Sequence, residues 1–216
     1  ETTRKLICLK RMTMAEKIAH WHRVFDYAAA RCIDVYLFTW NLYLYGVTDS
    51  GYGLTKAADD EGTKEYLRCS VAALLRTYPQ LRGIGVTAGE NLTHAWTEQQ
   101  DMGWVRETYG QGIERVLAET PDRPVTLILR AHMTTLAQMQ QAFADYPGQV
   151  EVSAKYAMAH MTATPRPRFT EDFLRAIPAG MKTWLTLRND DFYLFPCADA
   201  PFLTALVAHM PLDIMD

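Results

Sequence analysis

Carboxylate side chains that follow apolar runs are the residues of this sequence best suited to catalysis. Glu90 ends the segment Ala88-Gly89-Glu90, directly after one apolar run, and its two small neighbours leave room for a ligand. Asp190 and Asp191 follow a later apolar run. Two opposed carboxyl groups can cleave a glycosidic bond, because one protonates the leaving oxygen while the other attacks the sugar carbon or activates water. We therefore predict Glu90 as the general acid and Asp190 or Asp191 as the nucleophile or base. A helix-dipole glutamate and a turn aspartate are the alternatives.

Cations, amides and aromatic rings follow the other apolar runs. Aromatic rings can stack on the apolar faces of sugars, and arginine or asparagine can donate paired hydrogen bonds to hydroxyls or to a uronate. The residues predicted to bind substrate are Trp40, Asn41, Arg130, His132, Lys155, Tyr156, His160, Arg188 and Asn189. The alternative interpretation is a solvated rim with an aromatic cover over the fold.

Three of these residues are cations that are expected to point into the same pocket, namely Arg130, Lys155 and Arg188. Cations in a pocket for neutral sugars would be costly without partners. The sequence therefore predicts an acidic glycan, such as a uronate or a sulfated sugar, held by the guanidinium of Arg130 or Arg188. The alternative is that the cations neutralise the three carboxylates in structural ion pairs.

Two alternating periodicities indicate which elements position these residues. Short apolar, β-rich runs predict strands at Leu6–Leu9, Asp34–Thr39, Gly83–Thr87, Val125–Leu129, Val150–Ala154 and Thr183–Leu187. Apolar residues three and four apart predict helices at about Met14–Arg31, Glu61–Tyr78, Asp101–Thr120, Thr135–Tyr146, Thr170–Ala176 and Pro201–His209. The first helix begins with a capping box formed by Thr13 and Glu16.

This order predicts an α/β fold with a parallel sheet, since several strands are apolar without alternation and must be buried on both faces. A barrel or an open doubly wound sheet would satisfy the pattern. Polar residues follow nearly every strand and no glycine-rich nucleotide loop is present, which favours a parallel (β/α)8 TIM-type barrel. Because such a barrel needs eight strands, residues 1–216 are interpreted as a single barrel domain that is incomplete at one or both ends, part of a longer protein. Leu212–Met215 is expected to begin another strand.

The charge pattern and the apolar runs exclude two classes of partner. The formal net charge is −3 and the basic residues are scattered, so no nucleic-acid surface is expected. No apolar run approaches the ~20 residues that span a bilayer, so no membrane partner is expected. The expected partner is a carbohydrate substrate, and the sequence indicates no oligomeric state.

No cofactor or metal is expected. The cysteines have no CxxC pair and are expected to be unpaired; they are Cys8, Cys32, Cys69 and Cys197. A mononuclear metal site made by Glu90, His132 and His160 is the alternative, although these residues form no tight ligand motif.

Four segments resemble bacterial proteins related to alpha-glucuronidase-like glycoside hydrolases. They are Leu9–Met12, Ile33–Asn41, Gly83–Asn91 and Thr183–Asp191. The resemblance implies a barrel, a polysaccharide-derived substrate, carboxylate catalysis and a periplasmic or secreted location. It aligns Glu90 with the acid position after the fourth strand if one strand precedes Leu6. One departure is that Gly89 precedes Glu90 and Asn91 follows it, whereas the large retaining clan of barrel glycosidases has asparagine immediately before the acid.

Two other functions fit the same residues. Lys155 ends a predicted buried strand and could form a Schiff base in a lyase or aldolase. A barrel that kept its aromatic and arginine side chains without catalysis would bind sugars only.

Overall fold

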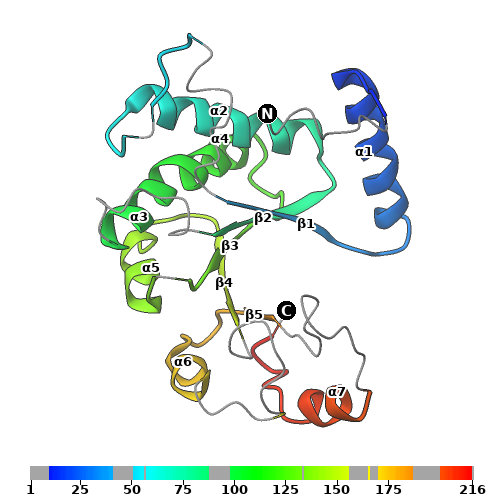
Figure 1. Cartoon of the computed structure of the whole chain (residues 1–216), viewed down its shortest axis with the longest axis vertical. Coiled ribbons are helices and arrows are strands. Elements are labelled where there is room, and N and C mark those ends of the chain that lie inside the picture. Colours follow the sequence, from blue (N-terminus) through cyan, green and yellow to red (C-terminus); the bar gives the residue numbers. More distant parts are fainter. Residues whose placement is uncertain are drawn as a thin grey trace, which may run out of the picture.

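A computed structural model describes residues 10–40, 51–55, 57–87, 98–132, 134–155, 165, 170–186 and 200–215. Within these residues, helices and strands alternate along the chain (Figure 1). The elements are α1 (Met14–Ala29), β1 (Val35–Trp40), α2 (Glu61–Thr77), β2 (Leu81–Thr87), α3 (Glu98–Val105), the π-helix η2 (Arg106–Gly110), α4 (Gln111–Glu119), β3 (Thr126–Arg130), α5 (Leu136–Ala142), β4 (Gln149–Lys155), α6 (Glu171–Ala176), β5 (Thr183–Thr186) and α7 (Ala200–Val207).

The five strands form one parallel sheet whose order, β1-β2-β3-β4-β5, is their order in the chain. Each matches a strand predicted from an apolar run, with ends that differ by at most two residues. Parallel neighbours require crossover connections, and the helices between the strands provide them. The predicted α/β fold with a parallel sheet is therefore confirmed, while the strand predicted at Leu6–Leu9 lies outside the described residues.

The sheet continues beyond β5 through a parallel bridge between Thr183 and Met215. The N–H of Thr183 donates to the carbonyl of Ile214 (2.7 Å), and Lys182 Nζ donates to the carbonyl of Asp213 (3.0 Å). Another strand was expected to begin in Leu212–Met215, and within the described residues this segment forms this isolated bridge and no strand.

The helix predicted over Asp101–Thr120 is a run of three segments, because a π-helical turn separates α3 from α4. Backbone carbonyls in and beside the wider π turn accept hydrogen bonds from side chains. Arg68 Nε from α2 donates to the carbonyl of Glu107 (2.7 Å), and Thr108 Oγ1 donates to the carbonyl of Trp104 (2.7 Å). The π turn is thus joined to another helix by a contact that the spacing of apolar residues along the sequence cannot reveal.

The predicted capping box at the start of α1 is confirmed. Thr13 Oγ1 accepts a hydrogen bond from the N–H of Glu16 (3.2 Å), and Glu16 Oε2 accepts one from the N–H of Thr13 (2.7 Å). Replacing Thr13 by alanine removes the first acceptor, so we expect the free energy of unfolding to fall by about 1 kcal/mol in urea denaturation. Thr204 lies inside α7, and Thr204→Ala is the control with little or no loss. Equal losses in the two variants would contradict the capping role.

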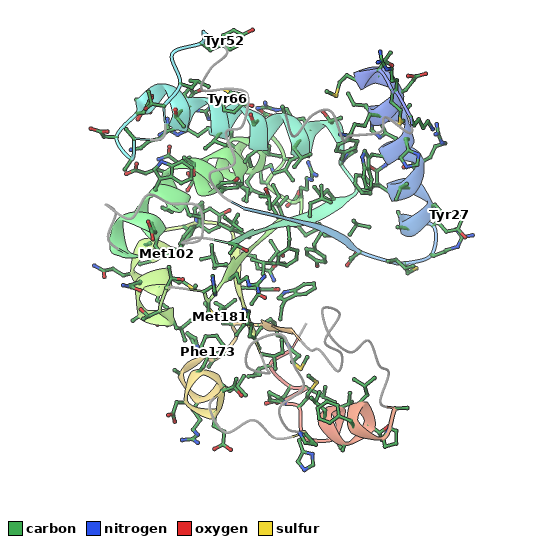
Figure 2. All side chains as sticks on the ribbon, viewed as in Figure 1. Tyr27, Tyr52, Tyr66, Met102, Phe173 and Met181 are labelled. Carbon is green, nitrogen blue, oxygen red and sulfur yellow. The ribbon has the colours of Figure 1, made fainter. Side chains whose placement is uncertain are left out.

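The outer face of the sheet carries the hydrophobic core. Alternate residues of the central strands pack beneath α2 and α4, and all are almost fully buried: Ile84, Val86, Leu127, Leu129 and Val152 from strands, with Leu75, Ile113 and Val116 from helices. Met102 on α3 is also buried, whereas Tyr27, Tyr52 and Tyr66 lie on the outside (Figure 2). The helices therefore cover one face of the sheet and leave the other to face inward.

The inner face shows that the sheet is strongly curled. Tyr36 and Trp184 lie on β1 and β5, at opposite edges of the sheet, yet their ring centroids are 4.8 Å apart. In a flat sheet, four inter-strand spacings of about 4.8 Å would hold these strands about 19 Å apart. The contact therefore requires a curl that is consistent with part of a barrel.

Two glycines of β2 make room for aromatic rings inside this curl. A Cβ on Gly83 would lie 2.9 Å from Cδ1 of Tyr36, and one on Gly85 would lie 2.1 Å from Cδ1 of Phe38. Both rings belong to β1, which pairs with β2 in the register Tyr36↔Gly83 and Phe38↔Gly85. The absence of side chains on β2 lets the β1 rings lean over it toward β5.

No helix within the described residues is long and apolar enough to cross a membrane. Cys32 and Cys69 are free thiols, as expected, and Cys8 and Cys197 lie outside the described residues.

Candidate functional site

The carboxyl ends of the strands form one edge of the curled sheet. The register pairs Trp40 with Thr87, Thr87 with Arg130, and Lys155 with Thr186. These five residues are the last of β1 to β5, so the loops that follow all leave from the same edge. This edge is where parallel barrels place ligands, because the loops there can vary while the opposite edge maintains the fold.

Three predicted site residues have described side chains, and all three lie at or just beyond this edge. Arg130 ends β3 on the same face as Ile128, and Lys155 ends β4 on the same face as Glu151, so both belong to the inner face. Both are half-buried. His132 follows β3, and its N–H donates to the carbonyl of Arg130 (2.9 Å) in a tight turn.

Arg130 and Lys155 are cations on adjacent strands, with Arg130 paired in register to Ser153, two residues before Lys155. Across the described parts of the chain, neither cation forms an ion pair with a carboxylate. The inner face thus carries two positive charges at the carboxyl ends of β3 and β4.

The remaining predicted site residues fall outside what the structure describes. Trp40 is described only as the final residue of β1. Of the predicted catalytic carboxylates, Glu90 lies three residues along the chain beyond β2, and Asp190 and Asp191 lie four and five residues beyond β5. Also outside the described residues are Asn41, Tyr156, His160, Arg188 and Asn189.

The inner face also holds a buried carboxylate that was not predicted from the sequence. Glu151 of β4 is 1% exposed, and its Oε2 accepts a hydrogen bond from Nε1 of Trp184 on β5 (2.5 Å). Its Oε1 accepts a second hydrogen bond from Nε2 of Gln149 (2.6 Å). The available signal was a glutamate inside a run otherwise typical of a buried strand, Val150–Ala154.

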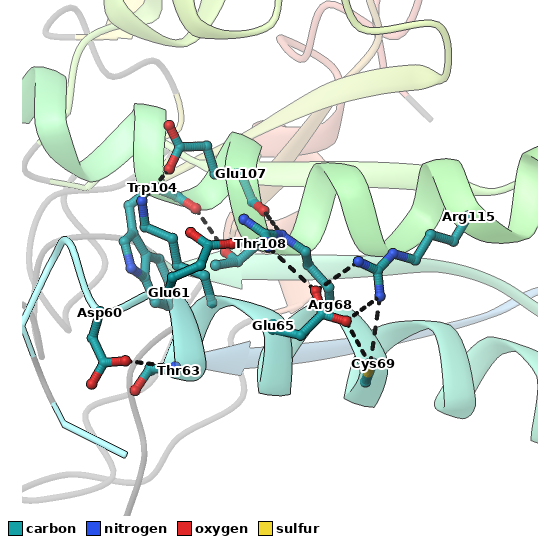
Figure 3. Close-up of polar contacts among 11 residues, drawn as sticks. Asp60, Glu61, Thr63, Glu65, Arg68, Cys69, Trp104, Glu107, Thr108 and Arg115 are labelled. Carbon is teal, nitrogen blue, oxygen red and sulfur yellow. Dashed lines mark hydrogen bonds and ion pairs between the residues drawn. The ribbon is translucent and has the colours of Figure 1, made fainter. Parts of the chain in front are cut away.

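A dense group of charged residues lies elsewhere, between α2 and the segment from α3 to α4 (Figure 3). Glu65 accepts two hydrogen bonds from Arg115 (2.7 and 2.8 Å), one from Cys69 Sγ (3.1 Å) and one from Arg68 (3.3 Å). Lys64 pairs with Glu107 on the π-helix (2.5 Å). These charges already have partners and join two helices, so we interpret the group as structural.

The hydrogen bond from Arg115, followed by that from Cys69, lowers the pKa of Glu65 to about 2. Because the folded-state pKa lies below the ordinary value, the stabilisation is present above about pH 4.5 and is lost as the pH falls toward 2. We expect Glu65→Gln to be less stable than the wild type at pH 7, with the gap closing between pH 5 and pH 2 in urea denaturation. Asp122→Asn, at an exposed carboxylate outside this group, is the control. A gap that stays constant with pH would contradict the ion-pair interpretation.

A cavity of about 470 Å³ lies at the opposite edge of the sheet, among residues that precede β1 and β3 and residues at the start of β2. Its charged groups have structural roles, because Arg82 pairs with Asp34 (2.8 Å) and Arg123 donates to the carbonyls of Leu75 (2.8 Å) and Tyr78 (3.0 Å) at the end of α2. In the described part of the chain, no three His, Cys, Asp or Glu side chains group as metal ligands. The carboxyl edge therefore remains the candidate site.

The architecture and the polar carboxyl edge define a parallel α/β protein with the curl of a partial barrel. No protein-family model matches the sequence, and no curated protein sequence matches it. Among solved structures, the chain is similar to a GH138 enzyme targeting pectin rhamnogalacturonan II, with a TM-score of 0.69 and 22% identity. The match covers 82% of this chain and 21% of that chain, so this chain spans about a fifth of that enzyme's length. At this identity the likeness shows the fold.

Proposed function

We propose that the chain forms part of a (β/α)8 barrel that hydrolyses glycosidic bonds in an acidic, polysaccharide-derived glycan, with the alpha-glucuronidase-like character that the sequence resemblance implies. The observation that carries the proposal is the curled parallel sheet, whose strands end at one edge beside two inward-facing cations. The likeness to a GH138 enzyme supports the same class of reaction.

The curl also supports the proposed pair of carboxylates. A chain extends at most about 3.6 Å per residue, so Glu90 is tethered within about 11 Å of the end of β2, and Asp190 within about 14 Å of the end of β5. Because the sheet is curled, the ends of these strands face a common mouth. We propose Glu90 as the general acid and Asp190 or Asp191 as the nucleophile or base. A carboxyl separation of about 5 Å would give retention of configuration, and one of about 6.5–9.5 Å would give inversion.

The proposed substrate is acidic because Arg130 and Lys155 are inward-facing cations at the ends of adjacent strands. A uronate carboxylate or a sulfate is the group that these cations would bind, with Arg130 providing a planar pair of donors and Lys155 a point charge. The GH138 enzyme targets a pectin, which supports a polysaccharide substrate.

Replacing Arg130 by lysine tests this substrate class, because the charge is kept while the planar pair of donors is lost. We expect the dissociation constant of an acidic oligosaccharide to rise about tenfold, and that of its carboxyl-reduced neutral counterpart to change by less than about twofold. Isothermal titration calorimetry with both ligands measures the difference. Arg175→Lys, on the exposed helix α6, is the control. Equal losses for the two ligands would contradict an acidic-group site at Arg130.

The reaction itself is tested in the whole protein by incubating it with acidic oligosaccharides and following new reducing ends. Hydrolysis that yields a free uronic acid or sulfated sugar supports the proposal. Specific binding on a glycan array without turnover would instead support a non-catalytic sugar-binding barrel.

A further inference from the structure

Glu151 is a buried ionisable group on the inner face that the proposed reaction does not use. It lies inside the curl, four residues before the end of β4, and both of its oxygens accept hydrogen bonds, one from Trp184 and one from Gln149. With 1% of the residue exposed, the carboxylate is shielded from solvent. It therefore lies beneath the mouth rather than in it.

A carboxylate in this position is not explained by stability alone. Moving a charged group out of water is costly, and an apolar side chain of similar volume often packs as well or better. A carboxylate can orient its partner, because the hydrogen bond that it accepts from the indole N–H is directional. The group that it directs is the side chain of Trp184.

The indole of Trp184 connects the two edges of the sheet. Its ring packs edge-on against Tyr36 (4.8 Å between centroids) and lies 6.3 Å from Phe38, both on β1. Trp184 itself is two residues before the end of β5. A contact series thus runs from β4 through Glu151 and Trp184 to β1, across the inside of the curl.

We propose that Glu151 and Trp184 form a positioning pair, in which the carboxylate fixes the indole and the indole sets the spacing between the carboxyl ends of β1–β2 and of β5. The inference rests on the proposed function to the extent that these ends carry Glu90 and Asp190 or Asp191. In this role neither member of the pair has to contact the substrate. Their effect on catalysis acts through the distance between the two predicted carboxylates.

Three variants of the whole protein separate this role from general structural support. Trp184→Phe keeps an aromatic ring but loses the N–H, and Glu151→Leu keeps the volume but loses the acceptor. In both we expect kcat on the acidic glycan to fall at least about tenfold with KM within about twofold, because the carboxylates are misplaced while binding is kept. Glu151→Gln keeps an acceptor oxygen for the indole, so kcat and its pH profile should stay near those of the wild type.

Trp104→Phe is the matched control, since this tryptophan is buried in the helical layer. It should lower the melting temperature without changing kcat at temperatures where the variant is folded. A second readout does not depend on activity: the indole ¹H–¹⁵N resonance of Trp184, assigned by its loss in Trp184→Phe. Its protection from solvent exchange should be lost in Glu151→Leu and kept in Glu151→Gln.

Two kinetic outcomes would overturn the positioning pair: equal loss of kcat in Trp184→Phe and Trp104→Phe, or a loss in Glu151→Gln as large as in Glu151→Leu. If Glu151→Leu does not fold, Trp184→Phe compared with Trp104→Phe decides the question. If the wild type hydrolyses no acidic glycan, the proposed function fails and the exchange measurement on Glu151→Gln and Glu151→Leu decides the pair. Unchanged protection in Glu151→Leu overturns it.

Discussion

Replacing Glu90 by glutamine is expected to lower kcat on an acidic oligosaccharide by about 10²–10⁴-fold, because the amide cannot donate a proton to the leaving oxygen. Binding should change little, since glutamine keeps the size and a hydrogen-bonding group. A substrate with an activated leaving group needs less protonation, so its kcat should fall much less. Steady-state kinetics of the whole protein on the two substrates measures this difference.

The partner carboxylate is tested by Asp190→Asn and Asp191→Asn, of which the one at the catalytic position should lower kcat for both substrates. Glu119→Gln, at an exposed carboxylate of α4 that pairs with Arg76, is the matched control and should keep the wild-type kcat. Full activity in both Glu90→Gln and Asp191→Asn would show that the assigned roles are wrong.

Replacing Gly83 by alanine is expected to lower the free energy of unfolding by about 2–3 kcal/mol. The new Cβ would lie 2.3 Å from the carbonyl oxygen of Thr126, on the neighbouring strand β3, and 2.9 Å from Cδ1 of Tyr36. The ring of Tyr36 could shift, but the backbone oxygen belongs to a paired strand and cannot move without disturbing the sheet. Urea denaturation of the variant and the wild type measures the loss.

Gly103→Ala provides the matched control, because Gly103 lies in α3 and a Cβ there would have no atom within 4 Å. Alanine favours a helix over glycine, so this variant should gain up to about 1 kcal/mol. Similar losses for the two substitutions would contradict the close approach of β2 and β3.

The strands and most helices were predictable because their signal is local. Val125–Leu129 is apolar at every residue except Thr126, which indicated a strand buried on both faces, and β3 occupies Thr126–Arg130. The break in the helix over Asp101–Thr120 was not predictable, since it depends on Arg68 of another helix reaching the carbonyl of Glu107.

The candidate site also contains residues that could be predicted from the sequence and residues that could not. Arg130 and Lys155 follow from strand ends alone, because parallel strands end at one edge. Glu151 and Trp184 could not be paired from the sequence, since their contact depends on the register of β4 with β5. The roles of Glu90, Asp190 and Asp191 stay predictions.

The strands follow the same order in the sheet as in the chain, and this order favours stepwise folding. Each strand pairs with the strand that precedes it in the chain, so pairing can proceed stepwise as the polypeptide leaves the ribosome. The contact between Tyr36 and Trp184 is different, because it joins the first and last strands of the sheet and must close a long loop. We therefore expect the helical layer and the strand pairs to form early and the inner aromatic contact to form late.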